Sequence, residues 1–162
     1  QLQNETELEH LLGALKAEQT RLSDLHGRYT PLAIKIAPDL ESEQITVIAS
    51  LLLKHRMDAV IATNTTTARE GVEHLPLGNE KGGLSGAPLT ERSTTVIRQL
   101  ANHLQHAIPI IGAGGIMSAR DAQLKIEAGA SLVQIYSGLI YRGPDLVTET
   151  ASLLCSRTAH AG

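Results

Sequence analysis

The chain has 162 residues and a formal charge of −3, with 14 lysines and arginines against 17 aspartates and glutamates. This balance excludes the basic surface that nucleic-acid-binding proteins require, so no nucleic-acid partner is expected. The single cysteine, Cys155, excludes an internal disulfide, and no apolar run approaches the roughly 20 residues of a membrane-spanning helix.

Helical and strand-like stretches alternate along the chain, beginning with a helix. Residues 4–25 carry leucines at helical spacing, which predicts an amphipathic helix on the outside of the fold. Four short apolar runs are typical of strands in a parallel sheet, at 32–37, 59–63, 108–112 and 132–136. The other helices are predicted at 42–55, 90–106, 118–128 and 144–154.

This α/β order fits two architectures. A complete (β/α)₈ barrel needs about 250 residues, so the chain is either a small α/β domain or half a barrel of four β/α units with a preceding helix. We expect residues 1–155 to form one domain and residues 156–162 to be a disordered tail. The start at Gln1 rather than Met suggests a truncated or processed product.

A lysine interrupts the first predicted strand. Lys35 lies between Ile34 and Ile36, and a charge in an apolar strand is costly to bury without a polar partner. The alternation of its neighbours favours the inner face of the sheet, where a lysine near the ligand end of a barrel would contact a cofactor. The alternative is an edge strand from which the side chain extends to solvent.

Small polar residues at 63–67 follow the second strand at its C-terminal end. Ligands of (β/α)₈ barrels are bound at that end, and hydroxyl and amide groups bind a polar planar substrate without a titrating charge. The alternative is a turn held by local threonine hydrogen bonds. The polar stretch 68–88 is predicted to be a long functional loop, in which residues 82–89 bring the backbone near a ligand.

Two glycine-containing loops follow the third and fourth predicted strands. Residues 112–115 contain three glycines before Ser118 and Asp121, a predicted N-cap and its capping-box partner. Free amides and the helix dipole at such a loop favour a phosphate group, although glycines also serve simply to turn a chain. Because (β/α)₈ barrels bind phosphate in the loops after strands seven and eight, this loop and residues 136–138 are predicted to hold one phosphate.

The remaining candidate ligands form no recognisable site. His103 and His106 are one helical turn apart, but no carboxylate or third ligand accompanies them, so both are predicted to face solvent and no metal is expected. Cys155 lies near the polar C-terminus, without the neighbours that a catalytic thiol needs.

Five motifs together resemble the dihydroorotate dehydrogenase family, in the family's order and over nearly the whole chain. They lie at 34–39, 61–66, 82–86, 111–116 and 133–138. Residues 62–66 and 137–144 are similar to the class 2, quinone-reducing, membrane-associated branch. The resemblance implies the C-terminal half of a (β/α)₈ TIM barrel, in an FMN-dependent oxidoreductase that oxidises dihydroorotate to orotate in pyrimidine (UMP) biosynthesis and passes the electrons to quinone.

The resemblance also implies roles for single residues. Lys35 and Thr63 would contact the flavin, with the lysine charge stabilising the reduced ring. Asn64 and Thr65 would hydrogen-bond the substrate. Four residues of the later loops would also hold FMN, the last three around its phosphate: Gly86, Gly115, Tyr136 and Ser137.

The chain departs from the family at its start. The family's catalytic base, a serine in class 2 or a cysteine in class 1B, precedes the helix with which this chain begins, so no catalytic residue is predicted within it. None of Ser23, Ser42 and Ser85 lies in the base motif. The missing N-terminal half, or another copy, is expected to cover the open barrel. That half would meet quinone and the membrane, peripherally on the cytoplasmic side, and the fragment alone would be inactive.

Two other functions stay open. A class 1 enzyme linked to fumarate or NAD would share most of these motifs, and assays of the electron acceptor separate the two classes. A non-catalytic module that binds a phosphate-bearing ligand is the alternative outside the enzymes. Such a module would leave Lys35 and the polar cluster at 63–65 without a purpose.

Overall fold

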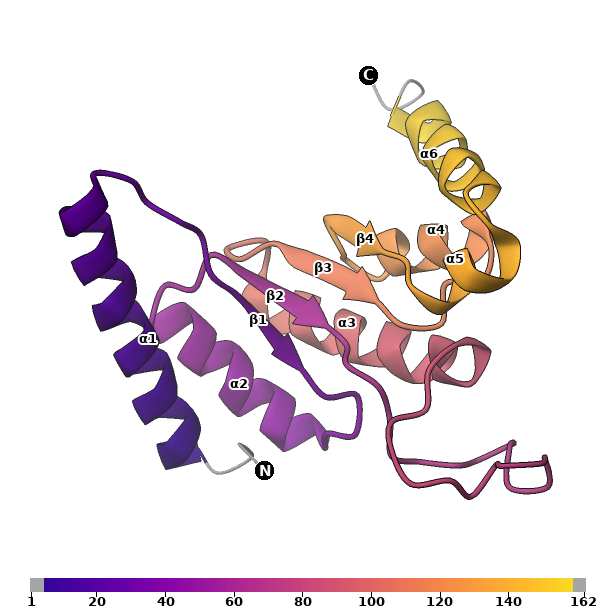
Figure 1. The fold of residues 1–162 in the computed structure, drawn as a ribbon. Helices are drawn as coiled ribbons and strands as arrows, with labels where there is room; N and C mark the ends of the chain where they lie inside the picture. The colour runs from indigo at the N-terminus through magenta and orange to yellow at the C-terminus, as the bar shows by residue number, and fades with distance from the viewer. Residues whose placement is uncertain (1–4, 159–162) are drawn as a thin grey trace.

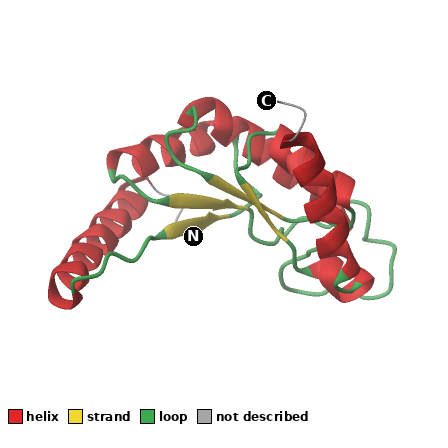
Figure 2. Cartoon of the chain, turned by 90° about the horizontal axis from the view of Figure 1, so that it is seen from above, coloured by secondary structure: helices red, strands yellow, loops and turns green. Residues whose placement is uncertain are grey.

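The computed structural model describes residues 5–158 and shows a curved parallel sheet with helices on one side (Figure 1, Figure 2). The strands are β1 (Ala33–Ile36), β2 (Ala59–Ala62), β3 (Ile110–Ala113) and β4 (Leu132–Gln134). The helices are α1 (Glu5–His26), α2 (Ser42–Lys54), α3 (Thr90–Leu104), α4 (Ala119–Glu127), α5 (Ser137–Arg142), α6 (Asp145–Thr158) and a 3₁₀ turn, η1 (Ala87–Leu89). All four predicted strands are confirmed. Within residues 5–158, no helix is long and apolar enough to cross a membrane.

The order of the strands identifies the architecture. They lie side by side in chain order, β1-β2-β3-β4, and every neighbouring pair is parallel. Because β-α-β crossovers share one hand, this order places α2, α3 and α4 on the same face of the sheet. A doubly wound sheet would reverse its order and carry helices on both faces. The fold is therefore part of a (β/α)₈ barrel, as predicted.

The core lies between the sheet and these helices. Val60 and Ile110 point toward the helices and are buried, together with Ile97 and Leu100 of α3 and Leu52 of α2. Isoleucine, leucine, valine and alanine side chains fill this core together with Met57, and no aromatic ring is among its described residues. The helices α2 and α3 also pack against each other, and α3 contacts both β2 and β3.

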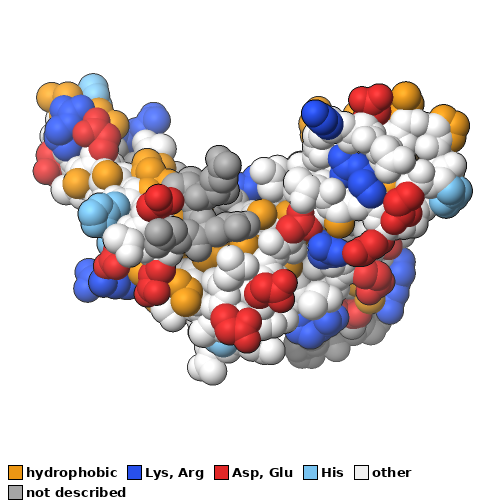
Figure 3. All heavy atoms as spheres, turned by 90° about the horizontal axis from the view of Figure 1, so that it is seen from below, with side chains coloured by type: hydrophobic (Ala, Val, Ile, Leu, Met, Phe, Trp, Pro, Cys, Tyr) orange, Lys and Arg blue, Asp and Glu red, His pale blue; other side chains and the backbone are white. Residues whose placement is uncertain are grey.

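The opposite, concave face of the sheet is open. Lys35, Ile61, Ile111 and Leu132 lie next to one another in the strand register on this face. In a complete barrel such residues form the packed interior, whereas Leu132 is here 61% exposed. The space-filling view shows the molecule hollowed between its two ends (Figure 3). The concave face is thus available both to a ligand and to further strands.

Helix α1 is amphipathic as predicted, but only part of its leucine stripe is buried. Leu8 and Leu12 are buried, whereas Leu11, Leu22 and Leu25 are exposed. The reason is that α1 packs only against α2 among the described elements and extends past it (Figure 1). The predicted amphipathic helix on the outside of the fold is therefore confirmed, and the leucines near its C-terminal end stay exposed.

The end of α1 is tied to the start of β1 through one carboxylate. Asp58 accepts hydrogen bonds from the Gln19 amide (3.0 Å), the Tyr29 hydroxyl (2.5 Å) and the Leu32 backbone N–H (2.8 Å). Burial by itself raises the pKa of Asp58, but these hydrogen bonds outweigh it, so the pKa lies below its usual value. These contacts fix the start of β1, the strand that contains Lys35.

The C-terminal region differs from the prediction in two places. Residues 137–142 form the short helix α5, which was not predicted because six residues are too few to show a helical period. Helix α6 begins at Asp145, close to the predicted start, but continues to Thr158. Residues 156–158, predicted to belong to a disordered tail, are therefore helical, and the remaining residues of that tail lie outside the described range.

Candidate functional site

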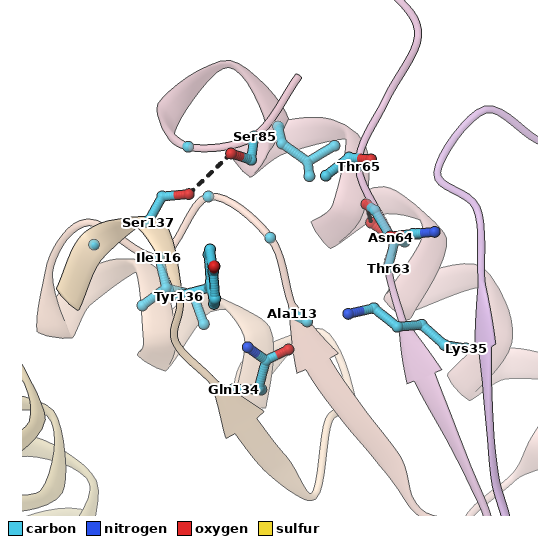
Figure 4. Close-up of a pocket in the computed structure, with 15 residues that line it drawn as sticks. Lys35, Thr63, Asn64, Thr65, Ser85, Ala113, Ile116, Gln134, Tyr136 and Ser137 are labelled. Atoms are coloured by element: carbon cyan, nitrogen blue, oxygen red, sulfur yellow. Dashed lines mark hydrogen bonds between the residues drawn. The ribbon is translucent and has the colours of Figure 1, made fainter. Parts of the chain in front are cut away.

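A single cavity at the C-terminal edge of the sheet contains every residue predicted to bind a ligand. It measures about 690 Å³ including its open mouth, within the size range of small-molecule sites. Its lining comes from the ends of all four strands and from the loops that follow them (Figure 4). The predicted residues that line it are Lys35, Thr63, Asn64, Thr65, Gly86, Gly115, Tyr136 and Ser137. The cavity thus brings together residues separated by about a hundred positions in sequence.

Lys35 supplies the charge of this cavity. Its side chain leaves β1 on the concave face, and its amine points across the cavity mouth toward Ala113 and Gln134 (Figure 4). β1 is an edge strand among the described residues and Lys35 is exposed, so the burial cost argued from sequence is not incurred in this chain. The inner-face position was nevertheless predicted correctly. Among the described residues that line the cavity, Lys35 alone is charged.

The polar cluster after β2 combines one buried residue with two exposed ones. Thr63 is buried, donates its backbone N–H to the Ala113 carbonyl (2.8 Å) and follows Ala62 through a cis peptide bond. The next backbone N–H, of Asn64, donates to the Ile36 carbonyl (2.7 Å). Because the backbone is held on both sides, the exposed side chains of Asn64 and Thr65 are free to meet a ligand (Figure 4).

An ion-pair network holds the start of the long loop. Asp39 accepts hydrogen bonds from the Thr66 hydroxyl (2.5 Å), the Thr67 backbone N–H (2.8 Å) and the Arg92 guanidinium (2.9 Å). Arg92 also pairs with Glu70 (2.9 Å). Burial by itself raises the pKa of the Asp39 carboxyl, but the hydrogen bonds from these three residues lower it below its usual value.

The same loop closes on itself through an arginine. The Arg69 guanidinium donates to the carbonyls of Glu80 (2.7 Å) and Gly82 (2.6 Å), which joins the first residues of the loop to its last ones. Thr66 and Leu84 then form an antiparallel bridge with two backbone hydrogen bonds. The stretch predicted as a loop is therefore irregular but well anchored.

The end of this loop packs over the predicted substrate residue. A β-carbon on Gly83 would lie 1.9 Å from the Thr65 hydroxyl oxygen, so only glycine fits against that side chain. Gly86 has a φ of +85° and lies beside Ser137, from the second glycine-containing loop. Residues 83–86 therefore connect the two sides of the cavity.

The glycine loop after β3 folds against the first turn of α3. Gly114 and Gly115 have φ values of +104° and +71°. Their carbonyls accept hydrogen bonds from the Ser93 hydroxyl (3.0 Å) and the Thr90 hydroxyl (2.7 Å). A β-carbon on Gly115 would lie 2.4 Å from the Thr90 backbone nitrogen. The next helix, α4, is capped as predicted, with the Asp121 N–H donating to the Ser118 hydroxyl (3.2 Å).

The loop after β4 meets the glycine loop at close range. Tyr136 is 73% exposed and is followed by Ser137, whose hydroxyl donates to the Ser85 hydroxyl (3.0 Å, Figure 4). A β-carbon on Gly138 would lie 2.1 Å from the Ile116 carbonyl oxygen. The two loops predicted to share one phosphate are thus in contact, which is the arrangement that sharing requires.

The comparisons with known proteins agree with this geometry. A family model for dihydroorotate dehydrogenase matches residues 1–157. The chain belongs to the dihydroorotate dehydrogenase family. The dihydroorotate dehydrogenase (quinone) of Nitrosomonas europaea is 97% identical to it over 162 residues, and that of Nitrosomonas eutropha is 83% identical. Each match covers 100% of this chain and 47% of the relative.

Solved structures of the family have the same fold. The crystal structure of DHODH from Eimeria tenella in complex with ferulenol matches with a TM-score of 0.89 and 32% sequence identity, over 99% of this chain and 46% of that one. The chain therefore spans about half the length of the relatives it matches and corresponds to their C-terminal half. The predicted resemblance to the quinone-type branch of dihydroorotate dehydrogenases is confirmed.

The roles of several site residues were not predicted. Ser85 and Gln134 line the cavity and lie within the motifs at 82–86 and 133–138, but no pattern distinguishes a single polar residue within them. Gly83 and Gly138 lay within predicted motifs, but their steric roles depend on partners distant in sequence. The expectation that no metal is bound is not tested. The Nε2 atom of His103 lies 3.1 Å from the Thr46 hydroxyl oxygen.

The Asp39 network yields a testable prediction for stability. Replacing Asp39 with asparagine removes charge-assisted hydrogen bonds, each worth about 1.5–3 kcal/mol, and should lower the free energy of unfolding by at least about 1.5 kcal/mol at pH 7. Because the folded-state pKa of Asp39 is lowered, its stabilisation is present above the ordinary carboxyl value and is lost as the pH falls through the lowered one. The difference between wild type and variant should therefore shrink in acid.

Urea unfolding at pH 7 and at pH 3 measures this difference. The measurement uses the completed barrel, by which we mean this chain fused behind the part of the Nitrosomonas europaea relative that it does not match. The control is Asp24→Asn, at an exposed aspartate of α1, which should change stability little at either pH. A loss that is equally large at both pH values would contradict a role for the Asp39 charge.

Proposed function

We propose that the chain supplies the FMN site and part of the substrate site of a quinone-type dihydroorotate dehydrogenase. The proposed reaction is the oxidation of dihydroorotate to orotate in pyrimidine biosynthesis, with quinone as the final electron acceptor. The observation that carries the proposal is that all eight residues predicted from the family's motifs line one cavity. They do so at the edge of the sheet where barrels of this kind bind their ligands.

The residues of the cavity fit FMN by chemistry and by shape. When bound, FMN would accept a hydride from the substrate and pass the electrons on. The backbone of Gly115 and the residues Tyr136 and Ser137 would hold its phosphate, since the two loops meet there and their glycines let the backbone come close to a ligand. Thr63 and Gly86 would hold its remaining parts.

Lys35, Asn64 and Thr65 would act on the other side of the cavity. The Lys35 ammonium would stabilise negative charge that develops there on reduction, because it is the charged group of the cavity lining. Asn64 and Thr65 offer an amide and a hydroxyl, which match the ring amides and carboxylate of dihydroorotate in donors and acceptors. Neither side chain titrates near neutral pH, so substrate binding by these two groups would not depend on their ionisation.

No residue of this chain is proposed as the catalytic base. Ser85 lines the cavity, but its hydroxyl accepts a hydrogen bond from Ser137, and within residues 5–158 no titrating group is hydrogen-bonded to it. We propose that the base comes from the part of the relatives that this chain does not span, as do the quinone contact and a peripheral position on the cytoplasmic side of the membrane. The isolated chain would then be inactive.

A titration with two flavins tests the proposal. FMN and riboflavin differ by the phosphate, so the completed barrel is expected to bind FMN at least about 100-fold more tightly, followed by flavin fluorescence. That ratio corresponds to about 2.7 kcal/mol, a modest value for several hydrogen bonds to a charged group. The same titration of this chain alone would show whether the phosphate loops are pre-formed. Equal affinities for the two flavins in the completed barrel would refute the phosphate site.

Electron acceptors test the quinone assignment separately. With dihydroorotate as the substrate, the completed barrel is expected to reduce a soluble quinone and to show no activity with fumarate or NAD. Activity with fumarate and none with quinone would instead favour the class 1 enzymes.

A further inference from the structure

A buried lysine lies behind the cavity and takes no part in the proposed function. Lys125 of α4 is fully buried. It packs against Gly112, where an added β-carbon would lie 3.0 Å from the β-carbon of Lys125. Its ammonium reaches the first turn of α3. There it donates to the Thr90 carbonyl (2.8 Å), the Ser93 hydroxyl (2.5 Å) and the Thr94 hydroxyl (2.6 Å).

The position of this ammonium is unfavourable for stability. Within residues 5–158 no ion pair involves Lys125, and a positive charge at the start of a helix faces the wrong end of the helix dipole. Burial lowers the pKa of Lys125 to about 8, with Asp121 and Glu91 opposing the shift. A methionine would fill the same space without a charge, so the lysine needs an explanation other than packing.

The ammonium determines how its hydroxyl neighbour bonds. An ammonium group can only donate, so the Ser93 oxygen must accept from it, which leaves the single Ser93 proton for an acceptor. Two carbonyl oxygens lie within reach of the Ser93 hydroxyl oxygen, that of Gly114 at 3.0 Å and that of Thr90 at 3.2 Å, and the Gly114 carbonyl is the nearer acceptor. The Thr90 carbonyl also accepts from Lys125, while the Thr90 hydroxyl donates to the Gly115 carbonyl. Lys125 therefore supports both contacts that hold the glycine loop.

These contacts fix the direction of two backbone amides. In a planar trans peptide the N–H points away from the carbonyl of the same unit. The Gly114 and Gly115 carbonyls face α3, so the N–H groups of Gly115 and Ile116 face the other way. Both residues line the cavity, and within the described part of the chain neither N–H donates a hydrogen bond to the protein.

We propose that Lys125 is a positioning residue for the phosphate-binding loop, which acts through Ser93 and Thr90 to aim the Gly115 and Ile116 amides at a phosphate monoester. The proposal rests on the proposed function, because it takes the loop to be a phosphate site. Lys125 itself touches neither ligand nor cavity. Its effect is therefore specific to the phosphate end of a ligand and leaves the ring end unchanged.

Three variants of the completed barrel test this role through the affinities for FMN and for riboflavin. Lys125→Met removes the charge, and Ser93→Ala removes only the oxygen between the lysine and the loop. Both are expected to lower the affinity for FMN about tenfold or more and to leave riboflavin binding nearly unchanged. The matched control is Thr94→Val, which removes another hydroxyl bonded to Lys125 but has no contact with the loop. It should preserve the ratio of the two affinities.

The possible outcomes separate the inference from the function on which it rests. Equal losses for both flavins in Lys125→Met and Ser93→Ala would indicate a purely structural lysine and overturn the inference. An unchanged ratio in both variants would overturn it as well. If the wild type fails to distinguish the flavins, the proposed function fails first, and the positioning role falls with it. Should Lys125→Met not fold, Ser93→Ala decides alone, since it deletes a single atom.

Discussion

Gly115→Ala is expected to lower the affinity of the completed barrel for FMN by about 100-fold or more, with a small effect on riboflavin. A β-carbon at this position would lie 2.3 Å from the Thr90 hydroxyl oxygen and 2.4 Å from the Thr90 backbone, so the loop cannot keep its place against α3. Moving the loop loses at least two hydrogen bonds to a charged phosphate, worth about 1.5–3 kcal/mol each, and tenfold in affinity corresponds to about 1.4 kcal/mol.

The chain offers a matched control for the backbone strain. Gly143 also has a φ of +71°, but a β-carbon there would have no neighbour within 4 Å. Gly143→Ala therefore adds backbone strain, about 1–3 kcal/mol in stability, because its φ of +71° and ψ of −170° form a conformation that glycine alone adopts readily, and it does so without displacing the loop. Its affinity for FMN should stay within about threefold of wild type. If the two variants bound FMN equally well, contact with Thr90 would not be what shapes the loop.

Lys35→Met is expected to slow reduction of the bound flavin by dihydroorotate by about 100-fold. The substitution keeps the length of the side chain and removes the charge of the cavity lining, where the proposed function requires negative charge to develop during reduction. Removing a single preorganised donor from such a site typically costs 10²- to 10³-fold in rate. Stopped-flow absorbance of the flavin in the completed barrel measures the step directly.

Two further variants make the Lys35 test specific. Lys35→Arg keeps a positive charge and should retain a rate well above that of Lys35→Met. Lys81→Met removes an exposed lysine of the long loop that does not line the cavity and should leave the rate unchanged. An unaltered flavin content together with an unaltered reduction rate in Lys35→Met would show that the lysine has no part in the reaction.

The strands and the location of the site could be predicted because their signals are local. Short apolar runs identified all four strands, and polar or glycine residues at their C-terminal ends identified the cavity lining. The topology then explains why these residues lie together, since parallel strands place their carboxyl ends at one edge of the sheet. The roles of the eight residues stay predictions, because position in a cavity does not establish function.

The burial of single side chains was not predicted, because it depends on partners distant in sequence. Lys125 has the sequence context of a surface residue in a polar helix, and its burial follows only from where α3 and the glycine loop pack. The exposed leucines at the end of α1 have the opposite cause, since their helical spacing is regular but no described element covers them. Periodicity identifies a face of a helix, and tertiary packing decides whether that face is buried.

The two ends of the cavity are encoded in separate stretches of the chain. Lys35 lies in β1, and Asn64 and Thr65 follow β2, whereas residues 85–138 contribute the loops around the glycines. Mutation can therefore act on one stretch while the other keeps its shape. If the chain has the proposed function, substitutions in the first two strands would change which ring is oxidised, and the later units would serve as a transferable module that binds a phosphorylated cofactor.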